Sequence, residues 1–299
     1  MLFTESSKGG LPQAYDGLPL PETPFGTLSQ AEEEEATFHT PSYWKDSEYQ
    51  IKNVYLCTKN KKMEQQHDPM GRAIKEYWKT GDKTPIRVFS PMFDEDEMPV
   101  ETLFRSYDDM PALEQQALNL AKGSTLDVGA GAGCHSLVLQ EKGIDVTAID
   151  ISPLSVETMQ GRGVMKVLQQ DFFTLTHQYN TILLLMNGIG IVGKAENLPV
   201  LFHLLDRILA PGGQLLFDSS DICYVFEDED GIIELPDTDG YYGNLVYQLQ
   251  YKDTKGEPFD WSYIDADTVR EAAEAHGYQL EIIQEGSHYD YLARISKKE

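Results

Sequence analysis

The chain has 299 residues and holds 24 Lys or Arg against 49 Asp or Glu, so its formal net charge is −25. A field of this sign repels phosphate backbones and anionic lipids, which disfavours nucleic acids and membranes as partners. Three widely spaced cysteines, no signal-peptide pattern and no membrane-length apolar run predict a soluble protein of the reducing cytoplasm, without a disulfide framework or a metal site.

Residues 1–62 differ in composition from the rest of the chain. They contain Gly9-Gly10, several prolines and an acidic run over residues 32–35, with little hydrophobic periodicity. This composition predicts a disordered N-terminal arm. The alternative is that translation begins at Met63, in which case the arm is not part of the natural protein.

Residues 63–116 are expected to form a cap in front of the main domain. Apolar residues at helical spacing predict a helix over residues 69–79, and residues 85–89 form a short extended piece. An acidic loop follows, and a second helix is expected with Asp109 near its start and Pro111 in an early turn. Since these elements precede the first core strand, we expect a helical cap that lies over it.

Strands and helices alternate strictly in the main domain, residues 117–299. The alternation predicts right-handed βαβ units and a parallel sheet covered on both faces. The expected strands are 125–128, 145–149, 166–169, 181–186 and 214–218, with helices at 134–142, 153–162 and 198–209. A hairpin insertion over residues 245–263, a helix at 267–276 and a closing antiparallel pair, 278–284 with 289–295, are expected to follow.

A glycine-rich turn joins the first core strand to its helix. Gly129, Gly131 and Gly133 alternate along the chain, and residues without Cβ tolerate positive φ and let the backbone approach a ligand. The next helix offers free N–H groups at its N-terminus. Asp150 ends the second strand, where a carboxylate can accept hydrogen bonds from a ribose. These features predict a site for a nucleoside-bearing ligand.

The spacing of the glycines distinguishes between such ligands. The dinucleotide fingerprint G-x-G-x-x-G requires a glycine where this chain has Cys134. Asp127, just ahead of the loop, would repel a pyrophosphate but attract the ammonium group of an amino acid. A second glycine run over residues 188–193 matches the fingerprint, yet no acid ends a strand about twenty residues later. A nicotinamide oxidoreductase is therefore the weakest candidate.

Residues 126–133, Asp150 and residues 170–172 together resemble class I S-adenosylmethionine-dependent methyltransferases, over roughly residues 117–295. The resemblance implies a doubly wound, Rossmann-like α/β fold whose seven-stranded sheet has an antiparallel last strand. It implies S-adenosylmethionine as the cofactor, with its methionine part at the glycine loop and its ribose on the acid that ends strand two. The cofactor-binding residues expected on this basis are Asp127, Gly129, Ala130, Gly131, Gly133, Asp150, Ile151, Asp171, Phe172, Met186 and Asn187.

The adenine end of the expected site has a physical rationale of its own. Asp171 can accept a hydrogen bond from an exocyclic amine, and Phe172 or Ile151 can pack on a purine face. Of the two neighbouring phenylalanines, Phe173 is the one expected to belong to the core.

Methyl transfer from a sulfonium is an in-line displacement, so a base is required only when the acceptor must lose a proton. Candidate bases are Asp218 and Asp221, which follow the fifth strand, and His135, which follows the glycine loop. Asn187 ends the fourth strand without the two prolines and aromatic residue that often follow it in amino- and base-methylating enzymes. This departure disfavours nucleic-acid N-methylation.

We expect the protein to methylate a small molecule. Two alternatives stay open, namely protein methylation and a non-catalytic subunit that binds S-adenosylmethionine. Two roles are expected for the aromatic residues in and before the insertion. Tyr247 and Tyr251 should pack a hairpin on the sheet, and Tyr241 and Tyr242 should form a lid. The sequence leaves open the acceptor, the methylated atom and the oligomeric state.

Overall fold

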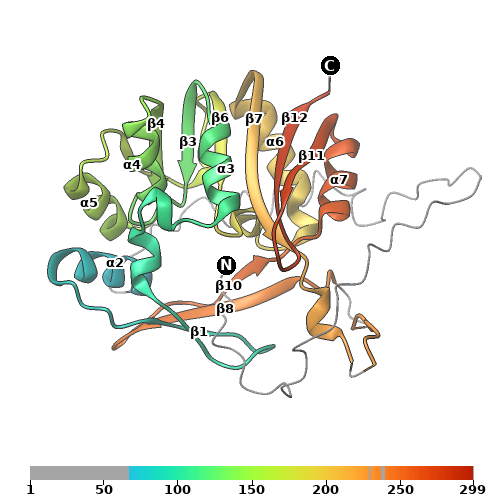
Figure 1. The fold of residues 1–299 in the computed structure, drawn as a ribbon, viewed down its shortest axis with the longest axis horizontal. Coiled ribbons are helices and arrows are strands. Elements are labelled where there is room, and N and C mark those ends of the chain that lie inside the picture. The colour runs from blue at the N-terminus through green and yellow to red at the C-terminus, as the bar shows by residue number, and fades with distance from the viewer. Residues whose placement is uncertain (1–66, 229, 237–239, 299) are drawn as a thin grey trace, which may run out of the picture.

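The computed structural model describes residues 67–228, 230–236 and 240–298. The arm expected over residues 1–62 lies outside this range. Two sheets build the described part of the chain (Figure 1), one of seven strands and one of five. Among the described residues, no helix is long and apolar enough to span a bilayer.

The larger sheet has the order β11-β12-β7-β6-β3-β4-β5. Strands β3 to β7 run parallel to one another, and β12 is antiparallel to its neighbours β7 and β11. The predicted seven-stranded sheet with an antiparallel last strand is confirmed. The strands are Ser124–Val128 (β3), Asp145–Asp150 (β4), Val167–Gln169 (β5), Tyr179–Leu184 (β6), Leu209–Ser220 (β7), Tyr278–Glu285 (β11) and Asp290–Lys297 (β12).

Helices cover both faces of this sheet, as alternating strands and helices require. Along β6, Ile182 and Leu184 pack towards α6 and α7, whereas Leu183 packs towards α3 and α4. Local signals fix helix ends: Ser152 caps α5 through a hydrogen bond from Ser155 N, and Gly163 ends it in a left-handed conformation. The helices are Ala112–Leu120 (α3), Cys134–Glu141 (α4), Pro153–Arg162 (α5), Leu198–Ile208 (α6) and Ala266–Ala275 (α7).

The smaller sheet joins segments that are about 160 residues apart in the chain. Its strands are Ile86–Phe89 (β1), Asp96–Met98 (β2), Asn244–Tyr251 (β8), Thr254–Lys255 (β9) and Phe259–Ser262 (β10). β1 pairs antiparallel with β8, so that Arg87 lies opposite Gln250. The strands of the expected N-terminal cap and those of the hairpin insertion therefore form one sheet. The cap, which was expected to be helical, is helical only in part. A boundary between residues 116 and 117 would cut α3, which packs on β7 and β12.

The smaller sheet and α2 (Pro69–Thr80) lie over the edge where the parallel strands end (Figure 1). A separate apolar core forms between them. It contains Ile74 of α2, Val88 of β1, and Tyr247 and Tyr251 of β8. Tyr247 and Tyr251 were expected to pack the hairpin on the main sheet, but they lie in this second core, beside α2 and β1. This second core positions the cap directly above the glycine loop, because Ala132 of that loop belongs to it.

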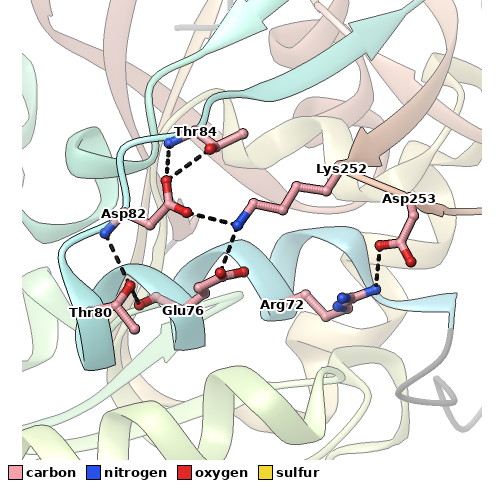
Figure 2. A network of polar contacts seen from close by, with 7 residues as sticks. All are labelled: Arg72, Glu76, Thr80, Asp82, Thr84, Lys252 and Asp253. Carbon is pink, nitrogen blue, oxygen red and sulfur yellow. Dashed lines mark hydrogen bonds and ion pairs between the residues drawn. The ribbon is translucent and has the colours of Figure 1, made fainter.

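Polar contacts also hold α2 to the turn between β8 and β9 (Figure 2). Lys252 Nζ donates to Glu76 Oε1 at 2.6 Å and to Asp82 Oδ2 at 2.7 Å. Asp82 Oδ1 accepts from both the backbone N and the hydroxyl of Thr84. Lys252 has a left-handed backbone, with φ 51°. We call Glu76, Asp82, Thr84 and Lys252 the clamp.

Lys252→Met should loosen the cap without unfolding the domain. Exposed ion pairs contribute little to global stability but can hold a local segment closed. Hydrogen bonds from Lys252 and Thr84 lower the pKa of Asp82 to about 2. The clamp should therefore hold the cap with its full strength above about pH 3.8, and this stabilisation should be lost as the pH falls towards about 2.

Amide hydrogen exchange measures this change. Exchange should become faster around residues 82–84 and 252–255 in the Lys252→Met protein, more so at low salt. Lys298→Met, which removes a lysine near Glu274 at the far end of the domain, is the matched control. Unchanged exchange at the clamp in Lys252→Met would show that the second core alone holds the cap.

Candidate active site

The glycine loop has the backbone that its sequence requires. Gly129, Gly131 and Gly133 have φ of 64°, 57° and 80°, all in the left-handed region. A Cβ at Gly133 would come within 3.0 Å of Met159 and Val164, so this glycine allows α4 to pack closely. A Cβ at Gly129 would meet no atom within 4 Å. The loop therefore has open space on the side where a ligand would lie.

Asp150 lies at the end of β4, beside the loop. Its Oδ2 accepts from Gly131 N at 2.9 Å and its Oδ1 from Ser152 N at 2.8 Å. Burial raises the pKa of Asp150 to about 6, and the nearby carboxylates of Asp68 and Asp127 add to the rise, against the lowering effect of the two backbone bonds. Each oxygen retains a lone pair for a ribose hydroxyl.

A small cavity lies between the loop and the end of β6. Its walls include Leu103, Asp127, Gly129, Ala130, His135 and Met186. Asp127 is buried, and its Oδ2 accepts from Ser136 Oγ at 2.6 Å. Desolvation raises the pKa of Asp127, while the neighbouring charge of His135 and the Ser136 hydroxyl oppose the rise. Gly131 lines the cavity as well, so five predicted cofactor residues and one candidate base share a single cavity.

His135 is tied into a buried ion network. Its Nε2 lies 2.7 Å from Glu114 Oε2, and Arg105 forms an ion pair with the same carboxylate. Burial alone would lower the pKa of His135. The neighbouring Cys134, the hydrogen bond to Glu114 and the carboxylate of Asp127 outweigh burial and raise that pKa to about 10.

The network changes the expectation for His135. A histidine that holds its proton at neutral pH is not poised to take another from an acceptor. Its position favours a structural and electrostatic role over that of a base. Sequence reasoning missed Glu114 and Arg105, because they come from α3 and the preceding cap segment and belong to no motif.

The adenine end differs from expectation at one residue. Asp171 accepts from Phe173 N at 2.9 Å, and burial raises the pKa of its carboxyl. The ring of Phe172 is only 2% exposed and belongs to the main core, whereas Phe173 is partly exposed. Phe172 therefore offers almost no face to a purine, which corrects that prediction. Ile151, 44% exposed beside Asp150, has the required apolar surface.

The ends of β6 and β7 bring Asn187 and Asp218 together. Asn187 N donates to Asp218 Oδ2 at 3.0 Å, and its side-chain Nδ2 donates to Ser262 O at 3.3 Å. Met186 and Asn187 have φ of 66° and 56°, an unusual conformation for two successive non-glycine residues. Burial raises the pKa of Asp218, against the lowering effect of the Asn187 N–H.

Asp221 has its own partners. Its Oδ1 accepts from the Tyr242 hydroxyl at 2.5 Å and from Cys223 N at 2.8 Å. Tyr241 lies against Tyr242 and donates to Asp265 Oδ2 at 2.6 Å. Both tyrosine hydroxyls are thus fixed to carboxylates beside the insertion, and the expectation that they form a lid remains a prediction.

The glycine run over residues 188–193 is a short 3₁₀ segment packed on β10. A Cβ at Gly190 would come within 2.3 Å of the Trp261 indole nitrogen. This glycine serves close packing, in agreement with its exclusion as a nucleotide loop.

A glycine loop between β3 and α4, an acid that ends the adjacent strand and this strand order together define a Rossmann-like methyltransferase. Residues 101–282 match the family model described as a methyltransferase domain, and the chain belongs to that family. The resemblance seen in the sequence is confirmed.

A crystal structure of a SAM-dependent methyltransferase from Bacteroides fragilis, in complex with S-adenosyl-L-homocysteine, is 49% identical with a TM-score of 0.75. The similarity covers 79% of this chain and 98% of that one. The putative methyltransferase YqeM of Bacillus subtilis is 31% identical over 117 residues, which are 36% of this chain and 47% of that protein. The matched part thus spans about half the length of that relative. The protein is an S-adenosylmethionine-dependent methyltransferase.

Proposed function

We propose that this methyltransferase acts on a small molecule. The observation that carries the proposal is the cover over the carboxyl ends of the parallel strands. α2 and the smaller sheet pack there through a continuous apolar core, and Leu103 of the cap forms one wall of the cavity. A protein side chain would need an open groove across these strand ends. The net charge of −25 also argues against a nucleic-acid acceptor.

The described residues suit the parts of the cofactor. Asp127 would hold the ammonium group and Asp150 the ribose hydroxyls, while Asp171 would accept from the adenine amine and Ile151 would pack on its ring. His135 gives the same cavity a positive charge. The ammonium and the carboxylate of the amino-acid end of the cofactor would therefore each find a group of opposite charge. When bound, S-adenosylmethionine supplies a methyl group on a sulfonium sulfur.

A methyl-transfer screen tests the acceptor class. The full chain and S-adenosylmethionine labelled in the methyl group are incubated with a cell extract divided by ultrafiltration into small molecules and proteins. We expect label in the small-molecule fraction, because α2 and the smaller sheet cover the strand ends at which the cavity lies. Asp150→Ala protein is the control for enzyme-dependent transfer.

Each other outcome selects a different function. Label found only in the protein fraction would overturn the proposal in favour of protein methylation. Binding of S-adenosyl-L-homocysteine without transfer to either fraction would favour the non-catalytic subunit.

A further inference from the structure

Two buried oxygen atoms at the ends of β6 and β7 have no hydrogen-bond donor among the described residues. They are Asn187 Oδ1 and Asp218 Oδ1. Asn187 is only 3% exposed, and no contact among the described residues serves its side-chain oxygen. Leaving a buried acceptor unpaired is costly, and native proteins rarely do so without a functional reason.

The surrounding contacts hold both oxygens in place. The other oxygen of Asp218 accepts from Asn187 N at 3.0 Å, and the amide nitrogen of Asn187 donates to Ser262 O at 3.3 Å. These bonds fix the two side chains relative to each other. They also leave the unpaired oxygens unable to rotate towards a donor without breaking a bond that already exists.

Neighbouring polar groups at the same strand ends already have partners. Ser219 Oγ donates to Ile264 O at 2.9 Å and accepts from Ile264 N at 3.0 Å. Asp221 accepts from Tyr242 and Cys223. Asn187 and Asp218 thus differ from Ser219 and Asp221, whose side-chain oxygens take part in hydrogen bonds. Met186, which precedes Asn187, lines the cavity at the glycine loop, so the pair lies next to the expected cofactor position.

We propose that the methyl acceptor is an amine, whose N–H groups bind Asn187 Oδ1 and Asp218 Oδ1. The proposal rests on the small-molecule function and deepens it. Both oxygens accept hydrogen bonds, so the best ligand atom carries at least two hydrogens. A hydroxyl offers one hydrogen, and a thiol offers one weak donor. A cationic ammonium also gains from the Asp218 charge, whereas a carboxylate acceptor would be repelled.

This arrangement gives Asp218 a catalytic role. An ammonium R–NH₃⁺ transfers one proton to the Asp218 carboxylate and becomes R–NH₂ with a free electron pair. That pair forms the new N–CH₃ bond as the S–CH₃ bond breaks, and the bonding pair of the broken bond stays on sulfur. The product is R–NH₂CH₃⁺, and the proton on Asp218 passes to solvent.

Product chemistry tests the acceptor atom. The small-molecule extract is divided in two, and one half is treated with acetic anhydride near neutral pH, which caps primary and secondary amines in preference to alcohols. Labelled methyl transfer by the wild-type protein should fall at least about tenfold in the acetylated half. The product from the untreated half should retain its label in alkali and bind a cation exchanger.

The outcomes separate the two proposals. Transfer that survives acetylation, or label released as methanol by alkali, overturns the amine acceptor while small-molecule methylation stands. No labelled small molecule from the untreated half contradicts both.

Variants test the two oxygens directly. Asp218→Asn should lower kcat roughly 100-fold or more, because it removes the proton acceptor. Asn187→Gly keeps a residue that tolerates the left-handed backbone and should raise the acceptor KM about tenfold. Both proteins should bind S-adenosyl-L-homocysteine like wild type, which shows that they are folded. Asp253→Asn, at an exposed carboxylate that pairs only with Arg72 across the clamp region, is the control and should be unchanged.

Wild-type kcat in Asp218→Asn, together with wild-type KM in Asn187→Gly, would overturn the amine site. A second outcome would also overturn the proposal: kcat falls in Asp218→Asn, but methyl transfer by the wild-type protein survives acetylation of the extract. Asp218 would then be the base for a hydroxyl acceptor.

Discussion

Asp150→Ala should reduce the affinity for S-adenosyl-L-homocysteine by roughly 100-fold or more. Each hydrogen bond from a ribose hydroxyl to a charged carboxylate contributes about 1.5–3 kcal/mol, and two are expected here. The variant also frees Gly131 N, which Asp150 Oδ2 holds at 2.9 Å, so the loop loses its anchor as well. Isothermal titration calorimetry measures the change.

Asp145→Ala is the matched control, because Asp145 lies at the opposite end of β4 and is paired with Lys166 at the surface. It should bind like wild type. Equal affinity of Asp150→Ala and wild type would contradict the assignment of the ribose site.

The pH dependence of binding gives a second measure of Asp150. Its pKa is raised to about 6, so the carboxyl takes up a proton as the pH falls through that value. A protonated carboxyl accepts fewer hydrogen bonds from hydroxyls. Affinity for S-adenosyl-L-homocysteine should therefore rise with pH through about 6 and then level. This step should disappear in Asp150→Ala.

Glu114→Gln should lower the free energy of unfolding by about 3–5 kcal/mol, the usual cost of removing one partner from a buried ion pair. Glu114 is the single anion between Arg105 and His135, and all three side chains are largely buried. The glutamine would remove the negative charge that these two buried cations share. Urea unfolding measures the loss.

Glu141→Gln, at the exposed end of α4, is the control for the same chemical change and should alter stability little. A loss of under about 1 kcal/mol in Glu114→Gln, the size found for surface pairs, would mean that the network is not a buried ion cluster in solution.

The same network predicts a dependence of stability on pH. The folded pKa of His135 is raised to about 10, above its ordinary value of 6.5. Because the folded pKa lies above the unfolded one, protonated His135 stabilises the fold fully below about pH 6.5. This stabilisation is lost as the pH rises through about 10. Wild-type stability should therefore decline over this window. The decline should be absent in His135→Gln, which has no proton to lose.

The cap contacts the residues that are expected to hold the cofactor. Asp68, which caps α2, accepts from Ser152 Oγ at 2.5 Å, and Ser152 N in turn donates to Asp150. Ile74 of α2 lies 3.7 Å from the place where a Cβ of Gly131 would be. We therefore expect binding at the glycine loop and packing of the cap to be coupled through these residues.

Local signals in the sequence were enough to predict the core. The helix expected over residues 153–162 has the bounds of α5, and the structure adds that Ser152 caps its start and Gly163 ends it. The positive φ of Gly129, Gly131 and Gly133 followed from their lack of Cβ. Asp150 beside Gly131 followed from the rule that parallel neighbouring strands end at the same edge of the sheet.

The sequence by itself thus determined the alternating α/β class and the carboxylates at the strand ends, which depend on short-range patterns, and its resemblance to a known family implied the cofactor. Only the tertiary structure decided that β1 pairs with β8, that Phe172 and not Phe173 is in the core, and that His135 lies against Glu114. It alone paired Asn187 with Asp218. The physical reason is the same in each case: burial and ion pairing arise between residues distant in the chain, and no local periodicity encodes them.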